Sequence, residues 1–136
     1  MEKKKEYTLS LVVPVFNEEE SIQAFIDTID KELEPLRDKL QIVFVNDGSR
    51  DKTRQVIEEV ISKDPRVTLI NLARNFGKEA ALSAGIDHAR GNAVLLIDAD
   101  FQHPLEMLSE MHALWQAGRF APAIAAMKAV GGAVLT

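Results

Sequence analysis

Two aspartates separated by one residue, Asp98 and Asp100, follow directly on a short apolar run, Ala93 to Ile97. Side chains in extended backbone repeat every two residues, so both carboxylates project to the same side. A divalent cation would offset their mutual repulsion, because hard cations prefer carboxylate oxygens and amide oxygens such as that of Gln102. The spacing leaves two interpretations open. It is typical of a divalent-metal site and also of a solvated acidic turn before a helix that begins at Pro104.

Each of four predicted strands ends at a group of polar residues. The strands are predicted from buried-type apolar runs, and they are Leu9 to Phe16, Gln41 to Val45, Val67 to Leu72 and Ala93 to Ile97. The polar groups that follow them are Asn17 to Glu18, Asp47 to Ser49, Arg74 to Lys78 and Asp98 to Gln102. Ligands of open parallel sheets bind beyond the carboxyl ends of the strands. The convergence therefore favours a ligand site at this edge. The sequence contains no Gly-rich phosphate-binding motif, so a metal ion would have to hold any phosphates at this site.

Helical periodicity separates the predicted strands. The first helix is predicted to start at a capping box, Asn17 with Glu20, whose acidic first turn complements the helix dipole, and to run to about Pro35. The later helices are predicted through Val56 to Ile61, through Ala81 to Ile86 and from Pro104 to about Ala117. Strict alternation of strands and helices predicts an α/β fold, a three-layer α/β/α arrangement with a mostly parallel sheet and right-handed crossovers.

The composition is that of a globular protein with one ordinary domain. The chain has 136 residues, of which 46% are hydrophobic and 27% charged, and this length is enough for a substantial core. A net charge of −5 argues against non-specific nucleic-acid binding. Because there is no cysteine, disulfides, thiolate chemistry and Cys-ligated zinc are excluded.

The sequence predicts no membrane-spanning segment. The apolar run after Lys3 to Lys5 is interrupted by Pro14 and Asn17, so it does not resemble a signal peptide. The apolar stretch from Phe120 to Thr136 is too short and too interrupted to cross a bilayer. We expect a cytoplasmic chain. Its one basic cluster, Lys3 to Lys5, is either a solvated terminus or a peripheral contact with the cytoplasmic face of a membrane.

Four motifs occur in order between Leu9 and Gly118, namely V-V-P-V-F-N-E-E-E, V-N-D-G-S-R-D, R-N-F-G-K-E-A-A-L-S-A-G and D-A-D-F-Q. Together they resemble the family-2 glycosyltransferases of GT-A fold, in particular the polyprenyl-phosphate type that includes bactoprenol glucosyltransferases and dolichol-phosphate mannosyltransferases. The resemblance implies a Rossmann-like nucleotide-binding half with strand order three, two, one, four. It also implies sugar transfer with inversion from a nucleotide sugar, UDP-glucose, to a polyprenyl phosphate lipid.

By this resemblance, the first two motifs would bind the nucleoside of the donor. Pro14, Phe16 and Glu18 would line the nucleoside pocket. Asp47 would contact the base or the ribose. The residues also have simpler explanations, because acidic residues are common at helix starts and Asp-Gly-Ser is a common turn between a strand and a helix.

The last two motifs would, by the same resemblance, bind the diphosphate. Asp98, Asp100 and Gln102 would hold Mg²⁺ or Mn²⁺, with Asp98 also at the nucleotide and Asp100 essential for catalysis, and Lys78 would contact the diphosphate or the sugar. A bound divalent ion is a Lewis acid for a diphosphate leaving group. A lipid phosphate acceptor is already an anion near neutral pH, since the second pKa of a phosphate monoester is about 6.

The resemblance ends at about Gly118, which predicts a donor-binding domain over residues 1–118 and an atypical Ala-rich tail over residues 119–136. The acceptor half of the family is expected to be missing. A non-catalytic nucleotide- or metal-binding module is therefore an alternative function. A receiver-like signalling domain is a weaker one, because its acidic residues would follow the first and third strands. Without further strands, Ala93 to Ile97 would form an exposed edge through which the chain self-associates, unless the tail covers it.

Overall fold

The computed structural model describes residues 7–99, 110, 113–114, 117–119 and 133–135. Its strands are β1 (Tyr7–Val15), β2 (Leu40–Asn46), β3 (Val67–Asn71), β4 (Gly91–Leu96) and β5 (Ala133–Leu135). Its helices are α1 (Ile22–Glu32), α2 (Thr53–Ile61) and α3 (Lys78–His88), with a 3₁₀ helix, η1 (Glu34–Lys39), after α1. The strands form one sheet in the order β3-β2-β1-β4-β5, in which β1 to β4 run parallel. The predicted α/β class and the predicted order of the first four strands are confirmed.

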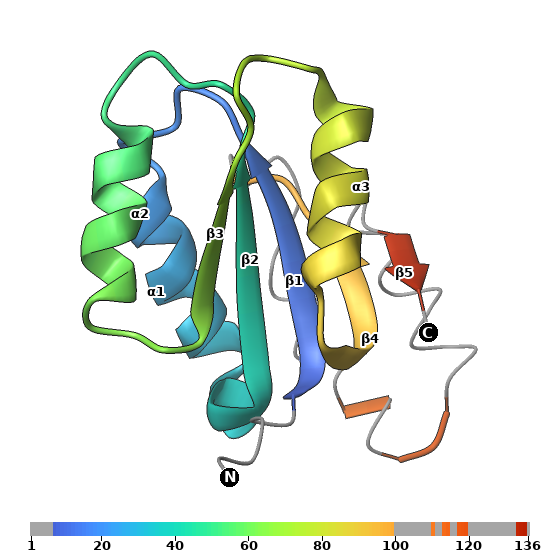
Figure 1. The fold of residues 1–136 in the computed structure, drawn as a ribbon. Coiled ribbons are helices and arrows are strands. Elements are labelled where there is room, and N and C mark those ends of the chain that lie inside the picture. The colour runs from blue at the N-terminus through green and yellow to red at the C-terminus, as the bar shows by residue number, and fades with distance from the viewer. Residues whose placement is uncertain (1–6, 100–109, 111–112, 115–116, 120–132, 136) are drawn as a thin grey trace, which may run out of the picture.

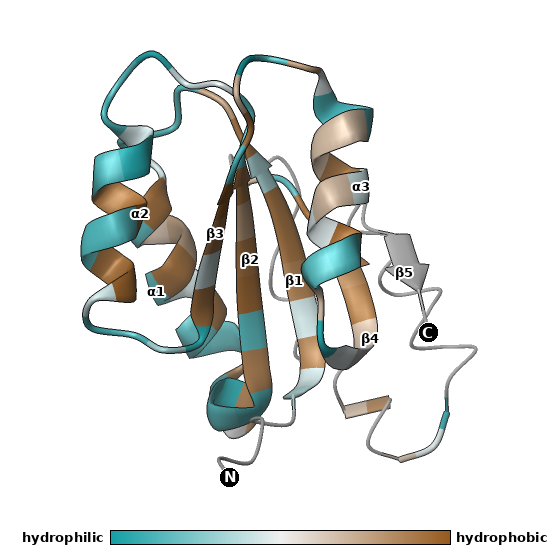
Figure 2. Ribbon diagram, in the orientation of Figure 1, coloured by the Kyte–Doolittle hydropathy of each residue, from teal (hydrophilic) through white to brown (hydrophobic). Residues whose placement is uncertain are grey.

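Helices cover both faces of the sheet: α1 and α2 lie on one face and α3 on the other (Figure 1). Side chains alternate along β1, so that Leu11 and Val13 belong to the larger apolar core and Val12 to the smaller one. The larger core holds α1 against the sheet, and within it the rings of Phe25 and Phe44 meet edge to face with centroids 6.1 Å apart. Because both faces are covered, the central strands are hydrophobic along most of their length, as Figure 2 shows.

Small residues let α3 approach the sheet closely. A Cβ atom on Gly85 would lie 2.3 Å from Val12 Cγ1 and 3.0 Å from Val45 Cγ2. Ala81, one turn earlier on the same face of the helix, is also buried. The helix predicted through Ala81 to Ile86 is confirmed. The small size of Ala81 and Gly85 sets the distance between α3 and β1, and so the position of the helix start at the carboxyl edge of the sheet.

A buried polar cluster joins three neighbouring strands. The Ser10 hydroxyl on β1 donates to Gln41 Oε1 on β2 (2.6 Å) and accepts a hydrogen bond from the Gly91 N–H on β4 (2.7 Å). Gln41 Oε1 also accepts from the Arg90 N–H (2.8 Å). A slip of one residue in the strand register would leave these buried groups unpaired, which is costly. The cluster therefore favours a single register of β1 against β2 and β4.

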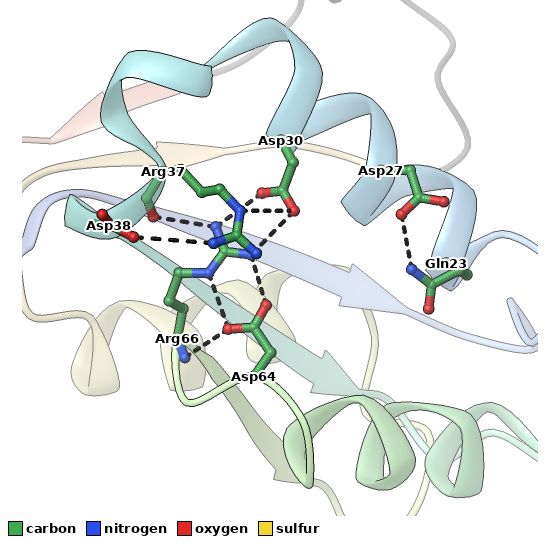
Figure 3. A network of polar contacts seen from close by, with 7 residues as sticks. All are labelled: Gln23, Asp27, Asp30, Arg37, Asp38, Asp64 and Arg66. Atoms are coloured by element: carbon green, nitrogen blue, oxygen red, sulfur yellow. Dashed lines mark hydrogen bonds and ion pairs between the residues drawn. The ribbon is translucent and has the colours of Figure 1, made fainter.

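A second polar cluster joins Arg66 to Asp30 and Asp64 (Figure 3). Arg66, only 3% exposed, donates from Nη1 to Asp30 Oδ1 on α1 (2.8 Å) and from Nη2 to Asp64 Oδ2 (2.6 Å). The Arg66 hydrogen bond lowers the pKa of Asp64, although burial opposes this. Burial alone would lower the pKa of Arg66, but its hydrogen bonds to Asp64 and Asp30 raise it. The cluster connects α1 with the loop that precedes β3, and the lowered pKa of Asp64 and the raised pKa of Arg66 keep this pair charged near neutral pH.

The predicted capping box at the start of the first helix is wrong. Helix α1 begins at Ile22 after Ser21, whose side chain makes no capping hydrogen bond, and its first turn contains no acidic residue. Asn17 instead adopts a left-handed backbone conformation, with φ of 54°. Its side-chain oxygen accepts a hydrogen bond from the Arg50 N–H (2.8 Å) in another loop. Contacts between loops thus override the local capping signal, and the α-helix ends at Glu32, with η1 continuing past the predicted end at Pro35.

The outer edge of β4 was expected to be open unless the tail covers it, and in the structure β5, from the tail, pairs with part of this edge. Val94, Leu95 and Leu96 pair with residues of β5 in antiparallel orientation. We expected no strand after the fourth, yet a short strand from the Ala-rich tail lies in the same sheet (Figure 1). The condition under which self-association was not expected, a tail that covers this edge, is therefore met over these three positions. Most of the helix predicted from Pro104 to Ala117 lies outside the described residues.

Candidate functional site

The loops that follow β1 and β2 bind each other at the carboxyl edge of the sheet. The backbone N–H groups of Asn17, Glu18 and Glu19 donate to side-chain oxygens of Ser49 (2.9 Å), Thr53 (2.9 Å) and Asp51 (3.3 Å), respectively. Burial would raise the pKa of Asp51, but hydrogen bonds from Thr53 and Glu19 lower it. These bonds satisfy the backbone of the first loop without a helix cap, and they fix the backbone that carries Phe16 and Glu18.

Asp47, at the end of β2, holds the loop that precedes α3. Its side chain is 5% exposed, and its two carboxylate oxygens accept hydrogen bonds from the backbone N–H groups of Phe76 (2.8 Å) and Gly77 (3.1 Å). The neighbouring Gly48 has a φ of +73°, and a Cβ there would lie 2.4 Å from the Asn75 backbone nitrogen. Glycine is therefore required for both the conformation and the close approach. The Asp47-Gly48 turn therefore packs against residues 74–77 and holds their backbone in place.

Lys78 and Asp98 form an ion pair across the edge. Lys78 is the first residue of α3, and its Nζ lies 2.9 Å from Asp98 Oδ1 and 3.2 Å from Oδ2. The Lys78 and Asp98 side chains are 61% and 39% exposed. Because Asp47 fixes the backbone of Gly77, one chain of contacts runs from the end of β2, through the start of α3, to the end of β4. The structure thus brings together three of the predicted site residues.

A pocket of about 570 Å³ opens between the loops that follow β1, β2 and β3. Its lining includes Phe16, three arginines (Arg50, Arg54 and Arg74) and polar side chains such as Asn46. Phe16 is 44% exposed, unusual for a large apolar side chain. An aromatic face beside guanidinium groups suits a ligand that is planar in one part and anionic in another.

The remaining predicted site residues are placed differently. Pro14 is half-buried within β1, where it pairs with Val45 of β2. Glu18 is half-buried, and its backbone binds Thr53. Asp100 and Gln102 lie outside the described residues. Among the residues that are described, no three His, Cys, Asp or Glu side chains are grouped so that they could hold a metal ion, and Asp98 is the predicted ligand that the structure places.

Several residues that shape this edge were not predicted. Asp51 and Thr53 hold the first loop together with Ser49, which was among the predicted polar groups, and Asn46 Nδ2 donates to Asn71 Oδ1 at the ends of β2 and β3 (3.0 Å). The Asp-x-Thr spacing is a local signal, because aspartate side chains often accept bonds from backbone two residues later, as Asp51 does from the Thr53 N–H (2.9 Å). The Asn pair has no such signal, since its members are far apart in the sequence.

Comparison with solved structures defines the class of this α/β protein. The mannosyltransferase PcManGT from Pyrobaculum calidifontis, solved in complex with GDP-Man and Mn²⁺, matches with a TM-score of 0.68 and 30% identity over 79% of this chain and 32% of that chain. TarS residues 1–349 from S. aureus, solved in complex with UDP-GlcNAc, matches with a TM-score of 0.69 and 26% identity over 81% of this chain and 31% of that chain. The fold is the GT-A fold of glycosyltransferases.

The sequence comparisons identify the family. The model of glycosyl transferase family 2 matches residues 10–134, and the chain belongs to this family. The prophage bactoprenol glucosyl transferase homolog of Escherichia coli (strain K12) is 50% identical over 111 residues, which are 81% of this chain and 36% of that protein. The chain thus spans about a third of the length of the curated relatives that it matches. Within the described ranges, none of the helices combines the length and the apolar character needed to cross a membrane.

Proposed function

We propose that the chain is the donor-binding part of a glycosyltransferase. This enzyme would transfer glucose from UDP-glucose to a polyprenyl phosphate, with inversion of configuration at the sugar carbon. The observation that carries the proposal is the 50% identity, over 81% of this chain, to proteins named bactoprenol glucosyl transferases. The arrangement of the edge is consistent with it. An aromatic and arginine-lined pocket lies at the ends of β1 to β3, and a carboxylate and an ammonium lie at the end of β4 and the start of α3.

Each part of the edge has a role in this proposal. Phe16 and Pro14 would contact the nucleoside, with Glu18 beside them. Asp47, whose two oxygens already bind the backbone of residues 76 and 77, would act at the ribose or base through its remaining lone pairs and would also position the loop. Lys78 would bind the diphosphate, because a lysine ammonium is a common phosphate ligand.

Asp98 fits a divalent cation by its chemistry and position. Its carboxylate is partly exposed at the end of β4 and already pairs with a cationic group, and carboxylate oxygen is the preferred ligand of Mg²⁺ and Mn²⁺. Asp98, with Asp100 and Gln102, would hold the ion. When bound, such an ion acts as a Lewis acid on the departing diphosphate. The proposed acceptor is a lipid phosphate. In the transfer assay, polyprenyl phosphate in detergent represents this acceptor.

Calorimetric titration tests the donor and metal assignments together. UDP-glucose, UDP and GDP-mannose are titrated into the chain with and without Mn²⁺, and we expect UDP compounds to bind more tightly with Mn²⁺. Asp98→Ala and Asp100→Ala should remove the metal-dependent part of UDP binding, because the ion would be left with too few protein ligands. Equal UDP affinity in the wild type and both variants at saturating Mn²⁺ would refute the metal assignment.

The same titrations, followed by a transfer assay, separate the enzyme from a non-catalytic module. The chain spans 36% of the E. coli relative, and orienting an acceptor against the sugar is worth about 7 to 11 kcal/mol. We therefore expect donor binding with very slow or undetectable transfer to polyprenyl phosphate by this chain alone. Donor binding without transfer in a chain extended to the relatives' length would favour the non-catalytic module.

A further inference from the structure

The Lys78 ammonium pairs with Asp98, the carboxylate that would bind the proposed metal ion. Its Nζ contacts both oxygens of Asp98, at 2.9 Å and 3.2 Å, so a cation approaching this carboxylate must share or displace the ammonium. We propose that Lys78 is a built-in competitor of the divalent cation: it neutralises Asp98 while the site is empty and transfers to the donor diphosphate when the cation binds. This inference rests on the proposed function and adds an order to the binding of metal and nucleotide.

The position of Lys78 is not explained by helix stability. It is the first residue of α3, where the helix dipole places partial positive charge and where acidic side chains are favoured. A lysine there is therefore electrostatically unfavourable for the helix. Asp98, from the end of β4, is the contact that offsets this cost. The pair is better explained as part of the site than as a device that stabilises α3.

The backbone on both sides of the ion pair is fixed. Gly77, immediately before Lys78, donates its N–H to the buried carboxylate of Asp47 (3.1 Å). The other end of the pair follows β4, which is hydrogen-bonded to β1, and the Ile97 N–H just before Asp98 donates to Val12 O (3.1 Å). Between these two fixed backbone segments, the four-carbon stem of the lysine side chain lets the ammonium turn away without a change in the fold.

The strength of the pair suits an exchange. Both side chains are substantially exposed, and exposed ion pairs contribute at most about 1 kcal/mol, which is about fivefold in a binding constant. A divalent cation with further ligands exceeds this amount, so the pair weakens metal binding without preventing it. Once displaced, the ammonium lies close to the metal-bound diphosphate and gains a more highly charged partner.

The proposal predicts opposite effects of one substitution on two ligands. Lys78→Gln should bind Mn²⁺ alone up to about fivefold more tightly than wild type, because the competitor is gone. At saturating Mn²⁺, the same variant should bind UDP more weakly than wild type, because the released ammonium no longer meets the diphosphate. A purely structural role for Lys78 would shift both affinities in the same direction or neither.

The experiment follows free Mn²⁺ by its electron paramagnetic resonance signal and then UDP by calorimetry, in wild type and Lys78→Gln. Lys63→Gln is the matched control, since Lys63 is also exposed and forms an ion pair, with Glu59 at 3.8 Å. Lys63 follows the carboxyl end of α2, whereas the loop after β2, which belongs to the candidate site, precedes the amino end of this helix. Lys63→Gln removes the same charge and should leave both affinities unchanged. In an Asp98→Asn background, Lys78→Gln should no longer raise the Mn²⁺ affinity.

Each outcome decides one of the two ideas. If wild type binds Mn²⁺ and UDP but Lys78→Gln binds Mn²⁺ no more tightly, the competition is refuted while the proposed function stands. If Lys63→Gln raises the Mn²⁺ affinity as much as Lys78→Gln does, the effect is one of net charge, and the competition is again refuted. If wild type binds neither Mn²⁺ nor UDP, the proposed function fails and the inference fails with it.

Discussion

Arg66 places a full charge among apolar residues, so its value to the fold depends on its two carboxylate partners. The side chain is 3% exposed, whereas those of Asp30 and Asp64 are 23% and 16% exposed. Removing one member of such a buried cluster leaves the others uncompensated, which typically costs about 3 to 5 kcal/mol. The three residues come from α1 and from the loop before β3, so the cost falls on the packing of α1 against the sheet.

We predict that Arg66→Met lowers the free energy of unfolding by about 3 kcal/mol, the low end of that range, because both aspartates keep some contact with water. Urea unfolding measures the loss. Arg37→Met is the control, since Arg37 also approaches Asp30 (3.6 Å) but is 53% exposed, and it should cost at most about 1 kcal/mol. Comparable losses in the two variants would contradict the importance of burial here.

The pH dependence of stability gives a second readout of this prediction. Arg66 holds the folded pKa of Asp64 below its ordinary value of 3.8. A carboxyl with a lowered folded pKa stabilises the protein above its unfolded pKa, and this stability is lost as the pH falls through the folded pKa. The advantage of wild type over Arg66→Met should therefore be full near neutral pH and should decline below about pH 4. A constant difference down to strongly acid pH would mean that packing, not charge, carries the effect.

At the scale of elements, apolar runs were sufficient to predict β1 to β4, because strands covered on both faces need hydrophobic residues almost throughout. The start of α1 was not predictable in the same way. Asn17 and Glu20 match a capping pattern, but Asn17 binds Arg50 and Ser49 in a loop more than 30 residues later. Long-range hydrogen bonds compete with a local cap, and the sequence pattern carries no information about which partner is present.

The contact between α3 and β1 yields a prediction for Gly85. Gly85→Ala should destabilise the protein by about 1 to 3 kcal/mol, because the new methyl would lie 2.3 Å from Val12 Cγ1 and overpacking costs this much. The gain in helix propensity, at most about 1 kcal/mol, offsets part of it. Chemical denaturation measures the change.

A double substitution is the control for Gly85→Ala. Val12→Ala removes the atom that the new methyl would meet, so Gly85→Ala should cost less in a Val12→Ala background than in wild type. Additive costs would mean that the helix shifts away from β1 instead of being compressed against it. A stabilising Gly85→Ala would show that the close approach is not rigid.

Across the whole molecule, the sequence predicted which element ends meet at the carboxyl edge of the sheet, but not the contacts between their side chains. Asp98 and Lys78 were each predicted at an element end, and parallel strands bring such ends to one edge. Their ion pair was not predicted, since the two residues are 20 positions apart and nothing local connects them. Asp47 was predicted at the site, whereas the hydrogen bonds that its carboxylate accepts from the Phe76 and Gly77 backbone followed only from the structure. Topology is therefore more accessible from sequence than side-chain pairing.

The tail strand β5 is the other feature that the sequence did not predict, and it determines whether the sheet has an open edge at β4. Three residues in an Ala-rich stretch form too weak a strand signal to recognise alone. Their pairing with Val94, Leu95 and Leu96 uses the backbone. Residues 91–96 contain neither lysine nor proline, the residues that commonly protect an edge strand from pairing with another chain. Among the residues that the structure describes, β5 is the strand that pairs with this edge of β4.

We predict that the intact chain stays monomeric and that a chain lacking residues 119–136 self-associates at high micromolar concentration through the exposed edge of β4. Light scattering coupled to size-exclusion chromatography measures the masses. Val134→Pro and Leu135→Pro are controls in the 136-residue chain. Neighbouring residues of an antiparallel strand alternate in pairing, so one of the two substitutions must remove a hydrogen bond to β4 and promote the same association. Amide exchange should be slow along β4 in the intact chain and faster in the truncated monomer. If the intact and shortened chains are both monomeric, with slow exchange along β4 in each, then β5 is not what closes this edge.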